Sequence, residues 1–481
     1  MPMYKFKTEP YEHQKDALKK CWNKEAFAIF AEMGTGKTKI ALDNACILYN
    51  KGKIDRLLVV APKGTYMNWV QQEIPVHVPD YIEKNVLAWK PTNSEKYKQQ
   101  LKQIIQFDDF RLKIMVMNVE AFSTKKGVEF AKLFLIGKSM MIVDESTTIK
   151  NPQAKRTKHI LSLAKETKYR RIMTGSPVTQ SPMDLWAQMD FLDPEILGQS
   201  SYYAFRTRFA VVITANAAGG THKYQKIVKF KNLAQLGQLV SPHSYRILKK
   251  DCLDLPDKVY TKREVELTDE QQKVYGEMKA NAITMLSTGE TLTAVNVLTQ
   301  LIRLHQITCG HMKTDAGETV QLKNNRLSEL MQILGETTGK VIIWANYIHD
   351  ILSIKNAVEE EFGLNSCCTY YGGTKTEDRQ TCINNFQDEN NPVRFFIGNT
   401  QTGGYGITLT EASTVIYYSN NYDLEKRIQS EDRAHRIGQK NKVLYIDLVA
   451  KGTVDDKIIQ ALRNKVNIAN EINGEDLANW I

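Results

Sequence analysis

Ala31-Glu32-Met33-Gly34-Thr35-Gly36-Lys37-Thr38 follows an apolar run at 27–30 and precedes a helical pattern at 40–49. A buried strand, a glycine-containing loop and a helix in this order form the context that a phosphate-binding loop requires. The glycines let backbone N–H groups turn toward phosphate oxygens, Lys37 supplies a charge to the outer phosphates, and the Thr38 hydroxyl can bind magnesium. The stretch predicts a nucleotide site formed by Met33, Gly34, Thr35, Gly36, Lys37 and Thr38, with Ala31 where the strict pattern has glycine.

A second apolar run, at 140–143, ends in two carboxylates, Asp144 and Glu145. Phosphoryl transfer depends on positioning and charge neutralisation more than on covalent chemistry. We therefore expect Asp144 to hold magnesium through water, and Glu145 to orient or deprotonate the attacking water. An Asp-Glu pair alone is more often a solvated strand end, so this interpretation depends on Lys37 in the same half of the chain.

Size, charge and cysteine content narrow the class of protein. The 481 residues exceed what one hydrophobic core usually supports, so two or three domains are expected. The net charge of +10 favours a polyanionic partner without proving one. The N-terminus lacks an apolar signal core, and no run approaches the ~18 apolar residues of a membrane span. Seven scattered cysteines show neither a disulfide framework nor paired zinc spacing, which predicts a reducing compartment.

Short apolar runs alternate with amphipathic stretches twice along the chain. This predicts an α/β fold with two parallel sheets, each covered by helices on both faces. The first series lies at 27–30, 57–61, 114–117, 140–143 and 171–173, and the second at 341–344, 394–397, 415–418 and 443–449. We place the first domain at residues 1–195, a mainly helical insertion at 196–330 and the second domain at 331–481.

The insertion has its own pattern. Polar helices are expected at 269–286 and 295–306, after a glycine-containing turn at 217–220 and a lysine-rich alternating segment at 223–231 that together predict a basic hairpin. His305, Cys309 and His311 could be imagined as metal ligands, but no fourth ligand stands nearby at zinc-site spacing. A helix end is therefore the expected structure there.

The order of these motifs resembles the motif series of helicase superfamily two, and more narrowly the Swi/Snf-type translocases. The resemblance rests on Gln14, residues 31–38, 59–63, 144–147 and 174–177, with further matches at Trp69, 149–151, 248–251 and 255–256. It continues with 403–407, Gln429 and the string 433–439, Arg-Ala-His-Arg-Ile-Gly-Gln, the most diagnostic signal in the chain. The resemblance implies two tandem RecA-like domains that use ATP and Mg²⁺.

Residue roles follow from the resemblance alone. It implies that Gln14 recognises adenine, although Gln14 taken by itself would be an ordinary helix-surface residue. Arg436 is the first choice for an arginine finger and Arg433 the second, with Gly406 and Gln429 also at the nucleotide. The turn at 174–177 would touch DNA backbone and relay that contact to the ATP site. The residues that match family DNA-contact motifs are Lys63, Asn118, Ser176, Gly373, Arg379, Thr400 and Gly404.

The chain also departs from the family pattern. Ser146 and Thr147 stand where a small residue and histidine are common, which raises the question of how hydrolysis is coupled to the neighbouring motif. Thr402 and Thr408 replace the usual alanine and asparagine, so DNA stimulation could be weaker or tuned. The compact chain leaves no room for histone-reading modules and resembles stand-alone bacterial and bacteriophage members, which predicts a cytoplasmic, nucleoid-associated location, with the nucleus as the alternative.

The leading hypothesis is a DNA-stimulated ATPase that translocates on double-stranded or branched DNA and remodels DNA structures or protein–DNA complexes. Its expected partner is DNA, recognised with little sequence specificity because backbone contacts suffice, and the protein is expected to be monomeric and not bound to membranes. One alternative is a strand-separating DNA or RNA helicase that uses the basic hairpin as a wedge. A hypothesis of another class is an ATP-gated DNA clamp with little hydrolysis.

Overall fold

The structure, a computed structural model, describes residues 4–90, 92, 94–106, 110–199, 201–216, 223–252, 255–287, 294–313, 318–403 and 407–473. The chain forms two compact units. The first unit comprises Met1–Val211, Lys229–Asp254 and Asn467–Ile481, and the second comprises Val212–Val228 and Leu255–Val466. Within the described residues, no helix is long and apolar enough to cross a membrane.

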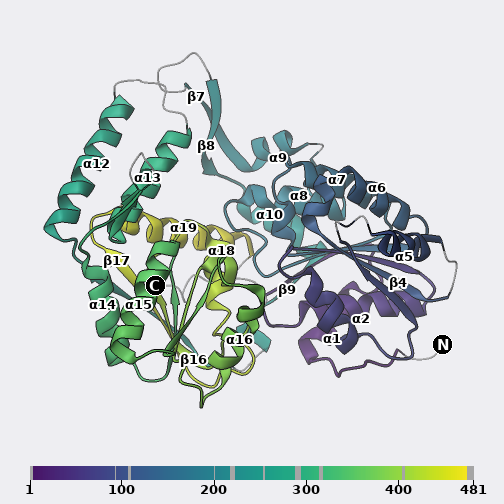
Figure 1. Cartoon of the computed structure of the whole chain (residues 1–481). Helices are drawn as coiled ribbons and strands as arrows, with labels where there is room; N and C mark the ends of the chain where they lie inside the picture. The colour runs from purple at the N-terminus through teal and green to yellow at the C-terminus, as the bar shows by residue number, and fades with distance from the viewer. Residues whose placement is uncertain are drawn as a thin grey trace. The chain divides into compact units, whose positions relative to one another are not determined.

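The first unit is built on a seven-stranded sheet in the order β3-β4-β2-β5-β6-β1-β9, with all its pairings parallel (Figure 1). The strands are β1 Ala26–Ala31, β2 Arg56–Ala61, β3 Lys84–Ala88, β4 Leu112–Asn118, β5 Ser139–Asp144, β6 Tyr169–Thr174 and β9 Ser244–Ile247. Alternate strand residues such as Phe27 and Leu57 pack into a core with α1 Glu12–Cys21 and α2 Lys37–Asn50. The opposite face is covered by α7 Lys155–Lys165 and α8 Leu185–Leu192 (Figure 1).

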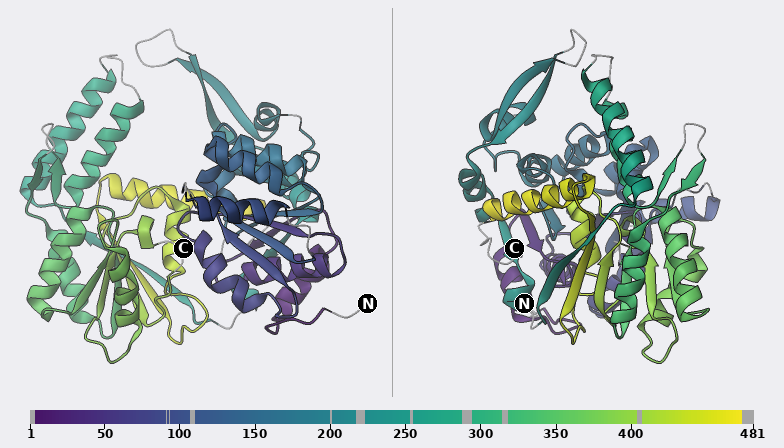
Figure 2. Two further views of the ribbon diagram at one scale, coloured as in Figure 1. Left: turned by 45° about the vertical axis from the view of Figure 1, so that its right-hand side comes forward. Right: turned by 90° about the vertical axis from the view of Figure 1, so that its left-hand side faces the viewer.

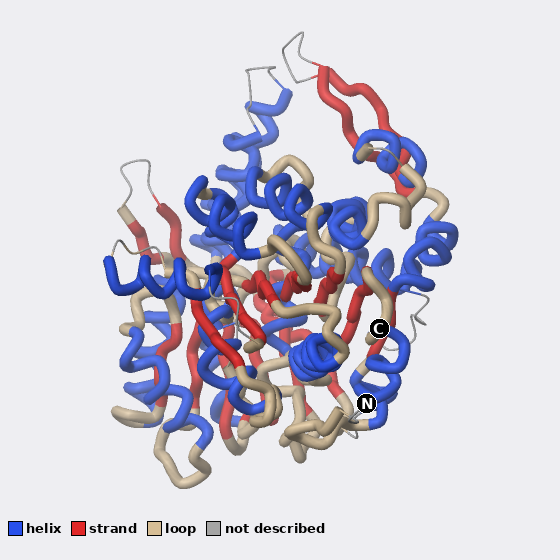
Figure 3. Tube along the Cα trace, turned by 90° about the vertical axis from the view of Figure 1, so that its right-hand side faces the viewer, coloured by secondary structure: helices blue, strands red, loops and turns tan. Residues whose placement is uncertain are grey.

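The second unit is built on a six-stranded parallel sheet in the order β10-β17-β16-β13-β15-β14. Its strands are β10 Lys258–Val265, β13 Lys340–Trp344, β14 Cys367–Tyr370, β15 Phe395–Gly398, β16 Ala412–Tyr417 and β17 Val443–Ala450. One face packs against α14 Asn325–Glu336 and α15 Ile348–Phe362, and the other against α16 Thr376–Gln387. Figure 3 shows the strands of the chain in red and its helices in blue.

The remaining elements complete the two units. Those before residue 250 include α5 Glu95–Gln106, α6 Lys125–Phe134, α9 Tyr202–Phe209 and α10 Leu233–Val240. Those after it include α17 Thr400–Gly403, α18 Leu424–Glu431, α19 Val454–Asn473 and the small antiparallel sheet of β11 His311–Lys313 with β12 Thr319–Gln321. The helices α12 Asp269–Ser287 and α13 Ala294–Thr308 lie side by side (Figure 2).

The predicted fold class, two parallel-sheet α/β domains, is confirmed by both sheets. The predicted helices at 269–286 and 295–306 are α12 and α13, and the predicted hairpin is the two-stranded sheet of β7 Ala210–Asn216 and β8 Lys223–Phe230. Its expected turn, 217–220, lies outside the described residues. The sequence patterns did not reveal β3, β9, β10 and β14, which form both edges of each sheet.

One disulfide bond is present that the sequence did not predict. The sequence predicted no disulfide, but Cys368 in β14 and Cys382 in α16 are joined by one. Their sequence spacing of 14 positions carried no recognisable framework, and only the packing of α16 against the sheet brings them together.

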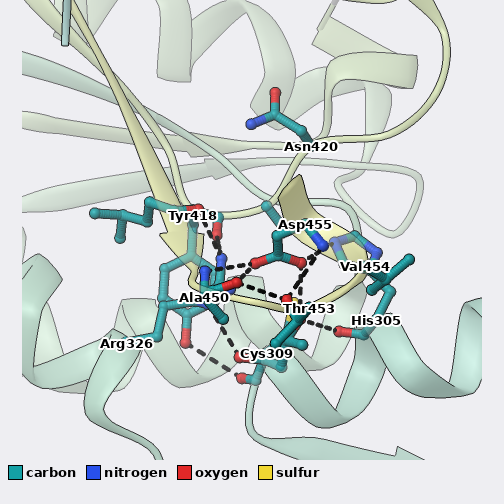
Figure 4. A network of polar contacts seen from close by, with 12 residues as sticks. His305, Cys309, Arg326, Tyr418, Asn420, Ala450, Thr453, Val454 and Asp455 are labelled. Atoms are coloured by element: carbon teal, nitrogen blue, oxygen red, sulfur yellow. Dashed lines mark hydrogen bonds and ion pairs between the residues drawn. The ribbon is translucent and has the colours of Figure 1, made fainter. Parts of the chain in front are cut away.

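A buried ion pair fixes several elements of the second unit (Figure 4). Arg326 of α14 donates hydrogen bonds to the carbonyl oxygens of Thr308, Tyr418 and Leu448 and forms an ion pair with Asp455 at the start of α19. Burial alone would raise the pKa of Asp455, but the Arg326 charge, the neighbouring His305 and hydrogen bonds from Ala450 and Arg326 together outweigh burial and lower that pKa. Arg326 thereby ties α13, α14, α19 and the ends of β16 and β17 together.

Candidate active site

The predicted phosphate loop connects β1 to α2. Gly34 and Gly36 both adopt a φ of 82°, a conformation that side chains disfavour. A Cβ atom at Gly36 would lie 2.1 Å from Gln14 Nε2, so a side chain there would displace Gln14 in addition to straining the backbone. Gly36 directly precedes α2, whose first N–H groups lack intrahelical acceptors and therefore suit an anion.

Gln14 lies behind this loop. Its side chain is only 3% exposed, donates from Nε2 to the Thr35 carbonyl at 3.1 Å and accepts from the Tyr11 N–H at 3.0 Å. His13 Nε2 lies 2.9 Å from the same carbonyl. The interpretation of Gln14 as a helix-surface residue was therefore wrong, because Gln14 helps to hold the loop in shape.

The first acidic residue lies at the end of β5. The buried Asp144 carboxylate accepts from Trp69 Nε1 at 2.9 Å and from the Glu145 N–H at 3.0 Å. Burial raises the pKa of Asp144, while the Trp69 hydrogen bond and the Lys37 charge act in the opposite direction. Lys37, itself buried, therefore lies close enough to Asp144 to stabilise its ionised form.

The second acidic residue has an unusual backbone. Glu145 adopts a φ of 45°, in the left-handed region that non-glycine residues seldom enter, and such outliers gather at functional sites. Glu145 Oε2 accepts from the Thr174 hydroxyl at 3.3 Å. The Thr174 hydroxyl in turn accepts from the Ser176 N–H at 3.2 Å, so the acidic pair and the 174–177 turn contact each other directly.

A second, buried connection joins the same two motifs. The Ser146 hydroxyl donates to Gln188 Oε1 at 2.6 Å, and Gln188 Nε2 donates to the carbonyls of Pro177 and Asp184, each at 2.8 Å. Ser146 and Gln188 are both fully buried. No sequence motif pointed to Gln188, whose one signal is a glutamine among mainly apolar residues of α8, where Asp190 is the other polar residue.

The three motifs converge because β5, β6 and β1 are consecutive neighbours in a parallel sheet. Their carboxyl ends therefore lie at one edge, where ligands of open α/β sheets bind. Thr38 in the first turn of α2 and Asp144 offer hydroxyl and carboxylate oxygens, the ligands that magnesium prefers. Together with Lys37 and the α2 N-terminus, this donor set fits a nucleotide triphosphate with Mg²⁺.

The two predicted arginines of the second unit differ in their surroundings. Arg433 is 1% exposed and donates to the carbonyls of Gln429 and Ile407 at 2.9 and 3.1 Å. Arg436 is half-buried and donates to the same Ile407 carbonyl at 3.2 Å. Arg433 therefore braces its own unit, and Arg436 is the better placed of the two to reach a ligand. Gln429 is buried, and Gly406 lies outside the described residues.

Most of the residues predicted to contact DNA lie at or after strand ends, in both units. Lys63 follows β2, Asn118 ends β4 and Ser176 follows β6 in the first unit, whereas Gly373 follows β14, Arg379 lies in α16 and Thr400 follows β15 in the second. Gly404 lies outside the described residues.

Some of these side chains also have structural contacts. Asn118 accepts from the Ala121 N–H at 2.9 Å and so caps a short 3₁₀ helix, and Arg379 donates to the Thr374 and Tyr371 carbonyls. Lys63 is exposed. Thr400 lines a small polar pocket with Asn346, Tyr417, Ser419, Asn420, Asn421 and Arg427. The Lys63 side chain is thus open to solvent, whereas the Thr400 side chain is buried.

Comparison with known proteins adds an independent finding. A family model described as SNF2-related domain matches residues 13–313, and one described as helicase conserved C-terminal domain matches residues 322–438. The chain is 28% identical to the CHD3-type chromatin-remodeling factor CHR7 of Arabidopsis thaliana over 95% of this chain and 37% of the relative. It is 27% identical to the nuclear protein STH1/NPS1 of Saccharomyces cerevisiae over 92% of this chain and 33% of that relative.

Smaller proteins also match. The chain is 25% identical to an uncharacterized ATP-dependent helicase of Mycoplasma pneumoniae over 95% of this chain and 41% of the relative. A solved SWI2/SNF2 ATPase core of Sulfolobus solfataricus in complex with dsDNA is 24% identical, with 98% of this chain and 96% of that chain covered and a TM-score of 0.44. The chain spans 33% to 41% of the length of the three relatives.

Proposed function

The chain belongs to the SNF2-related family of helicase-like ATPases, and from this premise we propose that it hydrolyses ATP when bound to DNA and translocates on double-stranded or branched DNA. Remodelling of DNA structures or of protein–DNA complexes is the proposed outcome. The observation that carries the proposal is the convergence of the phosphate loop, the acidic pair and the 174–177 turn at the carboxyl ends of β1, β5 and β6.

ATP binding is assigned to the first unit. The phosphates bind the loop and the N-terminus of α2, with the Lys37 charge beside Asp144. Thr38 and Asp144 would hold Mg²⁺, which neutralises charge on the transferred phosphoryl group. Glu145 orients the attacking water and receives the Thr174 hydrogen bond, so a change at the 174–177 turn reaches the catalytic carboxylate directly.

An arginine from the second unit completes the proposed chemistry. Arg436 supplies positive charge to the transferred phosphoryl group, while Arg433 holds the segment that carries it. Because Lys37 and Arg436 belong to different compact units, we infer that a cycle of ATP hydrolysis requires both units. If each unit also grips a phosphate backbone, this cycle moves the protein along DNA.

DNA is the proposed partner for three reasons. The chain carries a net charge of +10, its relatives include chromatin-remodeling factors, and most of the candidate contact residues in both units lie at or after the ends of parallel strands. Such hydroxyl, amide and basic groups suit backbone contacts rather than base contacts, so binding should show little sequence specificity. ATP, Mg²⁺ and DNA are the proposed ligands of a protein that acts as a monomer.

The test measures ATP turnover at low salt with and without duplex DNA. We expect duplex DNA to raise turnover several-fold, and equal rates would refute the coupling that is central to the proposal. Lys37→Ala and Glu145→Gln should abolish turnover while DNA binding survives. The exposed Lys53→Ala serves as the matched control and should behave as wild type. Wild-type turnover in either site variant would show that the catalytic assignment is wrong.

A further inference from the structure

Two histidines and one aspartate lie together in the second unit, outside every motif described above. His311 is the first residue of β11, and His349 and Asp350 lie in the first turn of α15. One ligand atom from each residue lies within 4.8 Å of the others. In the sequence His311 stands near His305 and Cys309 only, because 38 positions separate His311 from His349 (349 − 311).

The distances in this cluster suit a shared metal ion. His311 Nδ1 lies 3.0 Å and His349 Nδ1 lies 3.8 Å from Asp350 Oδ1. Two ligand atoms that each lie about 2.0–2.1 Å from a tetrahedral zinc ion are separated by roughly 3.3 Å. The observed separations lie on either side of this value, so small side-chain movements would create a zinc site.

Each of these three side chains has a buried atom without a hydrogen-bond partner in the described part of the chain. Among the residues that the structure describes, His311 Nδ1, His349 Nδ1 and Asp350 Oδ2 make no hydrogen bond. His311 and Asp350 are each only 2% exposed, and buried polar atoms without partners are costly. A cation bound between them would satisfy all three side chains at once. The His349 side chain is 31% exposed, which gives the ion a route from solvent.

We propose that His311, His349 and Asp350 bind one divalent transition-metal ion, with Zn²⁺ as the best fit and water in the fourth position. Two imidazole nitrogens and one carboxylate are typical zinc ligands, whereas Mg²⁺ and Ca²⁺ prefer oxygen ligands alone. The ion would join β11, which follows α13, to α15, which packs on the central sheet. Its role is therefore structural, separate from the proposed Mg²⁺ site of the first unit.

The experiment uses the untagged full-length protein after EDTA treatment, because a histidine tag would itself bind zinc. Zn²⁺ is titrated in competition with a chromogenic chelator, and thermal unfolding is recorded with Zn²⁺, with Mg²⁺ and with neither. We expect one equivalent of Zn²⁺ per chain and a higher unfolding midpoint with Zn²⁺ only, because a ligand that binds the folded state stabilises it. His349→Ala and Asp350→Asn should each weaken zinc binding at least tenfold.

His349→Ala is the decisive variant because its side chain is partly exposed, so its removal should leave the apo protein folded. His243→Ala, at a half-buried histidine of the first unit, is the matched control and should bind zinc as wild type does. Cobalt(II) gives a second readout, since the visible absorption of a tetrahedral site should appear in wild type and disappear in His349→Ala. Binding of well under one equivalent, or unchanged binding in His349→Ala, would show that the cluster is an ion pair only and overturn the proposal.

Discussion

Asp144 is a buried carboxylate at the end of β5, and burial raises its pKa against the opposing effects of Trp69 and Lys37. The unfolded carboxyl has a pKa of about 3.9. Because the folded pKa lies above the unfolded one, the folded protein binds more protons, and the contribution of Asp144 to stability falls as the pH rises from the unfolded pKa through the folded pKa. The buried Asp144 carboxylate therefore lowers the free energy of unfolding most at neutral pH, which is where the proposed catalysis needs it ionised.

Asp144→Asn tests this conclusion, because the amide does not titrate. We expect the unfolding midpoint of wild type minus that of Asp144→Asn to be larger at pH 5 than at pH 7.5, measured in EDTA without nucleotide. If the variant also loses a hydrogen bond, the difference between wild type and variant changes by the same amount at both pH values. This contribution therefore cancels when the two differences are compared. A difference that stays constant, or grows with pH, would contradict the raised pKa.

The two arginines of the 433–439 string make a second residue-scale prediction. Arg433 is buried and braces the Gln429 and Ile407 carbonyls, so Arg433→Ala should lower the unfolding midpoint as well as turnover. Arg436→Ala should reduce DNA-stimulated kcat by roughly 10³ to 10⁵, the usual value of an arginine finger, with little change in the unfolding midpoint. Kinetics and thermal unfolding of both variants check this. A lower unfolding midpoint in Arg436→Ala, with only a loss of turnover in Arg433→Ala, would make Arg433 the arginine finger.

Residue-scale predictions from the sequence were limited to motif positions. The loop 33–38 and the pair Asp144 and Glu145 lie where strand, loop and helix patterns indicated. The burial of Gln14 and the presence of Gln188 could not be predicted, because both depend on contacts with residues distant in the sequence. A polar side chain becomes recognisable as a connector only when its partners are known.

At the scale of elements, buried strands were predictable and edge strands were not. The run 140–143 lies inside β5 and 341–344 inside β13, because central parallel strands are apolar on both faces. By contrast, β10 alternates exposed and half-buried residues along most of its length and joins the sheet only through β17. Its sequence does not differ from that of an exposed loop or surface segment, so β10 can be assigned to the second sheet only from the tertiary structure.

The link between the acidic pair and α8 leads to a prediction at this scale. Gln188→Ala would leave the Ser146 hydroxyl and the Pro177 carbonyl buried without this partner, at a cost of about 1–3 kcal/mol per group. If the link transmits DNA binding to the ATP site, Gln188→Ala should lower the ratio of DNA-stimulated to basal turnover more than it lowers basal turnover.

A double-mutant cycle provides the control for this prediction. Ser146→Ala, Gln188→Ala and the double variant are compared by that turnover ratio, and contacting residues should show a coupling of roughly 0.5–3 kcal/mol. Equal loss of basal and stimulated turnover would mean that the Ser146–Gln188–Pro177 link only stabilises the fold. Additive effects on the ratio would mean that the two side chains act independently.

At the scale of the whole molecule, two parallel sheets divide the proposed work. The first unit holds the nucleotide loop and acidic pair, and the second holds the arginines, while candidate backbone-contact residues occur in both. A protein with this division should couple each ATP to a step along the backbone rather than to recognition of a base sequence. The duplication of the fold was readable from the two series of apolar runs, but the nucleic-acid substrate was not, because backbone contacts carry no sequence signature.

Dependence on DNA length separates translocation from simple stimulation. A protein that moves along duplex DNA stays bound longer on a longer track, so turnover at saturating DNA should rise with duplex length and then level off. Stimulation by static binding, including that of a DNA clamp, should not depend on length once the binding site is covered. The measurement uses blunt duplexes of increasing length at constant base-pair concentration and constant salt, since salt alone changes phosphate binding. Parallel reactions with labelled strands, on blunt and on tailed duplexes, report unwinding. A translocase should leave the strands paired, whereas strand separation on either substrate would favour the strand-separating helicase.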